Sequence, residues 1–110
     1  MTVDVSKQMK RLEGKSTIGE KVSFGGMPVG VVEDEVCRMC RGDDYKNFLQ
    51  RIRLDEKKAA EFGSKYAYRW CYFTLSQKDG NLTFGQFALV QSEDQLHDML
   101  LEARKKGWLI

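Results

Sequence analysis

The chain lacks the features that mark several classes of protein. It has one proline, one histidine and three cysteines in 110 residues, and its charges nearly balance, at +2. Three cysteines, two of them close together, are not the framework of a disulfide-rich secreted domain. No apolar run reaches the ~20 residues of a membrane span, and the polar N-terminus lacks the apolar core of a secretion signal. We therefore expect a cytoplasmic protein with reduced cysteines and no membrane partner.

The composition predicts one folded domain over residues 1–110. Of these residues, 42% are hydrophobic and 31% are charged, which excludes disordered and low-complexity classes. Hydrophobic patterning predicts an α+β fold, in which two hairpins form an antiparallel sheet of about four strands with two or three helices packed on it.

The first hairpin is expected where alternating residues meet a pair of glycines. Residues 17–24 alternate, with Ile18, Val22 and Phe24 on the inner face. Gly25-Gly26 fits a two-residue turn with positive φ angles. Pro28 cannot donate to a strand ladder, which places the second strand at a sheet edge near its start. The acidic run 33–35 is expected to end that strand.

Helical patterns are expected in three places, and a short helical turn in a fourth. One covers residues 4–13, and a second begins at Asp43 or Asp44 with its apolar stripe at Tyr45, Phe48, Leu49 and Ile52. A short helix over 56–62 ends at Gly63. The last helix begins at Ser92 as N-cap and ends before Gly107, with an apolar stripe formed by Leu96, Met99, Leu100 and Ala103.

The second hairpin is the clearest strand signal. Residues 65–75 are dense in aromatics, Asp79-Gly80 marks a tight turn, and residues 82–90 return. A two-residue turn at Asp79-Gly80 places Leu75 opposite Phe84. Both faces of the hairpin are then apolar, and the face not needed for a two-layer core carries Tyr68, Trp70, Tyr72, Phe87 and Leu89.

An apolar sheet face of this size needs a cover. The cover could be a helix of the same chain, a second copy of the chain or a small ligand. The leading hypothesis is a non-catalytic binding or interaction module that forms a homodimer through this face or the helices beside it. The first alternative is a small-molecule binding protein whose apolar or aromatic ligand contacts Tyr68, Trp70, Tyr72 and Phe87. The lower alternative is a single-stranded nucleic-acid accessory protein, although the balanced charge argues against a nucleic-acid partner.

The sequence contains no recognisable catalytic or metal-binding pattern. Cys37 and Cys40 have the spacing of zinc and redox pairs, but only Cys71 and His97 remain to complete a set of four zinc ligands. The acidic residues before the pair would raise a thiol pKa rather than lower it. We therefore expect no metal, no cofactor and no enzymatic activity.

Overall fold

The computed structural model describes residues 10–40, 45–76, 79–85 and 91–108. Five antiparallel strands form one sheet in which each strand pairs with its neighbours in sequence. The elements are β1 (Lys21–Phe24), β2 (Met27–Met39), β3 (Tyr45–Leu54), α2 (Glu56–Phe62), β4 (Tyr66–Leu75), β5 (Leu82–Gly85) and α3 (Glu93–Lys105). Residues 10–13 add a helical turn. The α+β fold with an antiparallel sheet is confirmed, with five strands instead of about four.

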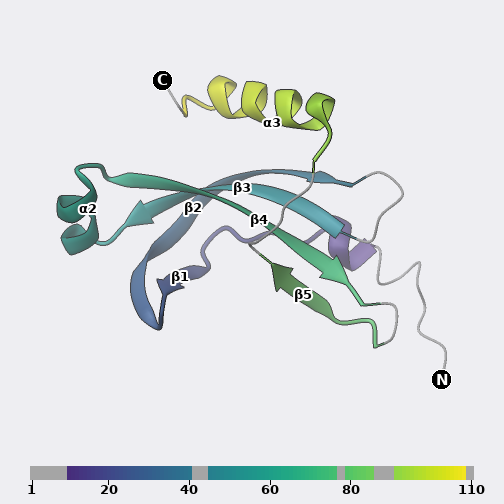
Figure 1. Cartoon of the computed structure of the whole chain (residues 1–110), viewed down its shortest axis with the longest axis horizontal. Helices are drawn as coiled ribbons and strands as arrows, with labels where there is room; N and C mark the ends of the chain where they lie inside the picture. The colour runs from purple at the N-terminus through teal and green to yellow at the C-terminus, as the bar shows by residue number, and fades with distance from the viewer. Residues whose placement is uncertain (1–9, 41–44, 77–78, 86–90, 109–110) are drawn as a thin grey trace.

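The sheet is curled rather than flat. Figure 1 shows the edge strands β1 and β5 bending to one side of the sheet, here called the concave side, while α3 lies across the other, convex side. The pairing of β1 with β2 shifts between Val22 and Ser23, and that of β2 with β3 shifts between Val32 and Asp34. Such bulges increase local twist and bend the strand, which accounts for the curl on this half of the sheet.

The helix expected from Tyr45 to Ile52 is wrong, because this segment is β3. As the central strand, β3 pairs with β2 on one side and β4 on the other. Phe48 contributes to the concave core and Leu49 to the cluster under α3, so apolar residues are required on both faces. A strand buried on both faces loses its simple alternation, and a short apolar run then mimics helical spacing.

The strand break expected at residues 33–35 is also wrong. β2 continues through these residues to Met39, and the bulge after Val32 accommodates the extra residue. Each neighbouring carboxylate has a partner on its own face of the sheet: Asp34 lies 3.3 Å from Lys106 Nζ, and Glu35 accepts a hydrogen bond from Thr17. β2 is an inner strand rather than an edge, but its pairing with β3 begins only at Gly30, beyond Pro28.

The β4–β5 register differs by two residues from the expected one. Phe73 faces Phe84 and Leu75 faces Leu82, so the connection spans residues 76–81 instead of Asp79-Gly80 alone. A two-residue offset leaves each β5 side chain on its expected face. It also places Gly85 opposite Tyr72, where a Cβ atom would lie 2.3 Å from the tyrosine ring.

The β1–β2 hairpin turns at Gly25-Gly26 as expected, with positive φ angles at both glycines. The expected inner face of the first strand is wrong at two of its three residues, because Val22 is buried whereas Ile18 and Phe24 are exposed. The bulge after Val22 breaks the alternation before Phe24.

Three apolar clusters hold the sheet and its helices together. Two lie on the concave side and are formed by Leu12, Phe48, Cys71, Phe73 and Leu75, and by Val22, Val29, Val32, Ile52 and Leu54. The third joins α3 to the convex side through Val36, Leu49, Met99, Ala103 and Trp108.

The short helix and the last helix begin and end as the sequence predicts. α2 covers residues 56–62, and Gly63 follows it in the left-handed conformation. The Ser92 side chain accepts a hydrogen bond from the Gln95 backbone at the start of α3. The expected apolar stripe of α3 is half wrong, because Met99 and Ala103 are buried but Leu96 and Leu100 are exposed. Of the helix expected over 4–13, residues 4–9 lie outside the described residues.

Candidate functional site

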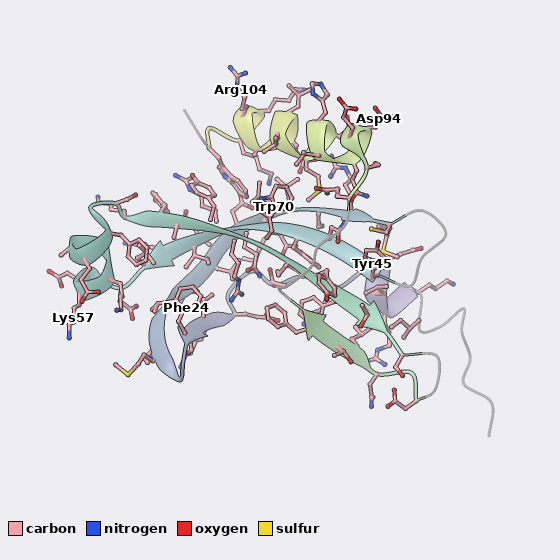
Figure 2. All side chains as sticks on the ribbon, in the orientation of Figure 1. Phe24, Tyr45, Lys57, Trp70, Asp94 and Arg104 are labelled. Atoms are coloured by element: carbon pink, nitrogen blue, oxygen red, sulfur yellow. The ribbon has the colours of Figure 1, made fainter. Side chains whose placement is uncertain are left out.

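The predicted aromatic face lies on the convex side of the sheet, beneath and beside α3. Figure 2 shows Trp70 between the sheet and this helix, and the indole packs against the cluster that contains Met99 and Trp108. The Tyr68 ring lies 5.8 Å from the Trp108 ring. The Tyr72 ring makes an edge contact with Tyr45 at 6.2 Å.

A helix of the same chain, α3, therefore covers the centre of this face. Such a helix is one of the three possible covers expected from the sequence. Tyr68 stays 37% exposed at the margin. Phe87 and Leu89, the other two residues of the predicted site, lie outside the described residues. That these five residues bind a ligand or a partner stays a prediction.

The structure has a different concavity on the opposite side of the sheet. A cavity of about 380 Å³ opens between the two edge strands. We call it the concave groove, and it is lined by Lys15, Glu20, Lys21, Val22, Ser23, Arg69, Phe73 and Phe84. The curl of the sheet forms this groove, because it brings residues of β1 close to residues of β4 and β5.

Three cations and one carboxylate line the groove. Lys15 Nζ lies 2.9 Å from Glu20 Oε1 and 4.8 Å from the centre of the Phe73 ring. Lys21 and Arg69 form no ion pair with the residues that the structure describes. The groove therefore has an excess of positive charge.

Arg69 is held in position by a neutral partner. Its Nε donates a 2.7 Å hydrogen bond to Gln50 Oε1, and its guanidinium carbon lies 5.1 Å from the centre of the Phe84 ring. Because the amide of Gln50 orients the guanidinium without neutralising it, Arg69 keeps its full charge beside an aromatic wall.

A row of polar residues crosses the concave side beneath the groove. Glu35 pairs with Gln50 on the neighbouring strand, and Gln50 pairs with Arg69. Thr17 donates to Glu35 Oε1 through both its backbone nitrogen and its hydroxyl, each at 2.7 Å. Gln50 is only 1% exposed, and its Nε2 has no hydrogen-bond partner among the described residues. A buried donor of this kind costs about 1–3 kcal/mol. Asn47 Oδ1 and Arg51 Nε also lack a hydrogen-bond partner among the described residues.

A buried lysine anchors one rim of the groove. Lys46 is 6% exposed, and its Nζ donates to the backbone carbonyls of Glu13 and Lys15. The ammonium group also lies 5.3 Å from the centre of the Phe48 ring. Lys46 thus fixes the segment that brings Lys15 to the groove.

The cysteine pair that the sequence singled out does not form a joint site. Cys37 packs against the concave core, whereas Cys40 accepts a 3.1 Å hydrogen bond from Asn47 on the convex side. Extended backbone separates their Cα atoms by roughly 10 Å, beyond the reach of a disulfide. Burial raises the pKa of Cys37, and it raises the pKa of Cys71 to about 11, so both thiols on the concave side are poor nucleophiles. Within the described ranges, no group of three or more potential metal ligands is present.

Little in the sequence indicated the groove. Arg69 lies between Tyr68 and Trp70 in the sequence. Because side chains alternate along a strand, Arg69 lies on the opposite face of the sheet from both. Lys15 and the groove residues from 20 to 23 lie about 50 positions before Arg69 in the chain, and only the curl of the sheet brings them to it.

In comparisons with protein-family models, curated proteins and solved structures, nothing matches this chain significantly. None of the helices in the described part of the chain is long and apolar enough to cross a membrane.

Proposed function

We propose that this chain is a non-catalytic binding module that holds a small organic anion with an aromatic or apolar body in the concave groove. The observation that carries the proposal is Arg69, a cation without a carboxylate partner among the described residues, positioned by Gln50 next to the Phe84 ring. A volume of about 380 Å³ lies at the small end of the range for ligand pockets.

Two chemical features define the ligand class. A planar carboxylate or a phosphate would pair with Arg69, because the guanidinium presents donors that match those oxygens. The Phe73 and Phe84 side chains would contact the flat or apolar part of the ligand. Glu20 neutralises Lys15, so the groove favours an anion of low charge over a polyanion such as a nucleic acid.

This proposal keeps the small-molecule alternative from the sequence and changes its location. We place the ligand on the concave side because α3 covers Trp70 on the convex side. We also keep the cytoplasm as the proposed compartment. The three cysteines support it, since none of them forms a disulfide.

Phenyl phosphate tests both features of the proposed ligand at once. Calorimetric titration should show one site per chain. Inorganic phosphate and benzyl alcohol, which each carry one feature, should bind at least about tenfold more weakly. If inorganic phosphate binds as tightly as phenyl phosphate, the aromatic walls contribute nothing and the proposed ligand class is wrong.

Two variants locate the site. Arg69→Gln should weaken phenyl phosphate binding by about ten- to a hundredfold, the range expected for a lost charged hydrogen bond. Arg53→Gln is the matched control, because Arg53 is exposed on the convex side and should bind like wild type. Lys21→Gln should also weaken phenyl phosphate binding. Lys21 is exposed, so this substitution should not disturb folding. Equal losses in Arg69→Gln and Arg53→Gln would show non-specific attraction and would refute the site.

A further inference from the structure

The outward side of α3 carries apolar residues that the fold does not use. Met99 and Ala103 are buried against the sheet, whereas Leu96, Leu100 and Leu101 are 40%, 37% and 42% exposed. Figure 1 shows the sheet on only one side of this helix. Three exposed leucines on a 13-residue helix form a stripe that is typical of a helix–helix contact.

Charged residues flank this stripe in a particular order. The exposed positions on this side of α3 run Glu93, Leu96, His97, Leu100, Leu101 and Arg104, with spacings of three and one residues in alternation. The spacing of these positions reads the same from either end, so an antiparallel copy sets Glu93 against Arg104, Leu96 against Leu101 and His97 against Leu100. Neither Glu93 nor Arg104 forms an ion pair with any described residue.

Such a stripe is complementary to itself when a second copy runs antiparallel. Glu93 then faces Arg104 of the second copy, and Leu96 faces its Leu101. Two-fold symmetry repeats each contact, so the pairing contains two opposite-charge pairs, two Leu96–Leu101 contacts and, at its centre, two contacts between Leu100 and His97. In a parallel arrangement, Glu93 would instead face Glu93 of the second copy and Arg104 would face Arg104, so like charges would meet. The interaction between the two helix dipoles is also favourable when the helices are antiparallel.

We propose that a second copy of this chain docks on the outward side of α3 and forms an antiparallel, two-fold symmetric dimer. The interface consists of Leu96, His97, Leu100 and Leu101, and the Glu93–Arg104 pairs determine its direction. This places self-association on the helix that covers the aromatic sheet face rather than on that face itself. It does not depend on the concave groove, which lies on the opposite side of the sheet.

The size of this contact predicts a weak dimer. A 13-residue helix is about 20 Å long, and two such helices bury less than the ~1,200 Å² at the low end of standard interfaces. We therefore expect dissociation constants in the micromolar range. Sedimentation equilibrium from about 5 to 500 µM should show the mass rising from 12.7 kDa towards twice that value. A mass of 12.7 kDa at every concentration would overturn the proposal.

Charge reversal tests the geometry. Glu93→Arg or Arg104→Glu alone should weaken the dimer by about tenfold or more, because each places like charges together at both ends. The double variant should recover wild-type association. A mixture of the two single variants should also form a heterodimer, since each of its two charge pairs again joins an acid to a base.

Neighbouring residues supply matched controls. Asp94→Arg and Lys105→Glu make the same charge changes in the same helical turns, so they share any cost to the helix dipole. Both residues lie about 100° further round the helix than Glu93 and Arg104, at the Leu101 edge of the stripe, and should weaken association much less than the stripe variants do. Figure 2 shows Asp94 and Arg104 at opposite ends of α3. Equal losses in the control and stripe variants, or no recovery in the double variant, would refute the antiparallel pairing.

Leu100→Gln removes the leucine at the centre of the interface without touching the charges. Leu100 is 37% exposed, so the monomer should keep its melting temperature to within a few degrees while dimerisation is lost. Unchanged association would show that the leucine stripe is not the interface.

Discussion

Trp108 should contribute more to stability than its position near the C-terminus implies. Its indole is 1% exposed and packs with Val36, Leu49 and Met99 under α3. Its backbone nitrogen donates to the Ala103 carbonyl at 2.9 Å, and Gly107 donates to Arg104, which together close the end of the helix. Trp108 therefore holds the last turn of α3 against the sheet.

We predict that Trp108→Ala lowers the free energy of unfolding by about 3–5 kcal/mol, the usual cost of emptying a buried aromatic site. With an unfolding entropy of about 2.1 cal/mol/K per residue, 1 kcal/mol corresponds to roughly 4 °C for a chain of this length. The melting temperature should then fall by roughly 13–22 °C. Urea unfolding followed by circular dichroism measures the free energy, and scanning calorimetry measures the temperature.

A control and a spectroscopic readout keep this reasoning testable. Phe62→Ala removes an aromatic ring that is 59% exposed on α2, and it should cost less than about 1 kcal/mol. In Trp108→Ala, Trp70 is the remaining tryptophan and loses part of its cover, so its emission in the folded protein should shift to the red. A Trp108→Ala variant within about 1 kcal/mol of wild type, with unshifted emission, would show that Trp108 does not hold α3 to the sheet.

Two further predictions test the concave side and the sheet. Gly30→Ala should destabilise the protein by about 1–3 kcal/mol or more, because its Cβ would lie 2.2 Å from the Arg53 carbonyl oxygen. In the control Gly14→Ala, the new Cβ meets nothing closer than 3.4 Å, and the urea unfolding midpoints of the two variants measure the difference. Burial raises the pKa of Cys71 from 9.0 to about 11, so the unfolded thiol ionises first and stability should fall as the pH rises from 9 to 11. Urea midpoints at pH 8 and 10.5 should show a smaller fall in Cys71→Ala, and an identical fall would contradict the buried thiol.

Local signals in the sequence identified much of the fold. Gly25-Gly26, Gly63 and Gly107 adopt positive φ angles where turns or helix ends require them, and Ser92 caps α3. β4 lies within one residue of its expected bounds, because its aromatic density gives a strong strand preference. These features depend on residues a few positions apart, so the sequence alone contains the physical cause.

Other features depended on residues far apart in the chain. Tyr45 to Ile52 has helical spacing, but its position between β2 and β4, with both faces covered, makes it a strand. The pattern of α3 could not show that Leu96 and Leu100 point away from the sheet, since polar Gln95 and Glu102 face it through hydrogen bonds to Met39 and Arg38. Both outcomes were decided by what packs on each face.

The concave groove depended on tertiary structure most of all. Lys21 and Arg69 have no common local pattern, and a curl produced in part by two bulges brings their strands to one cavity. Turns and helix caps are determined by neighbours along the chain, where the energy of a φ angle or a single hydrogen bond decides the outcome. Which residues face the core, and which segments pack against them, depends on the apolar surface buried over the whole sheet. That surface is buried only when the sheet has formed.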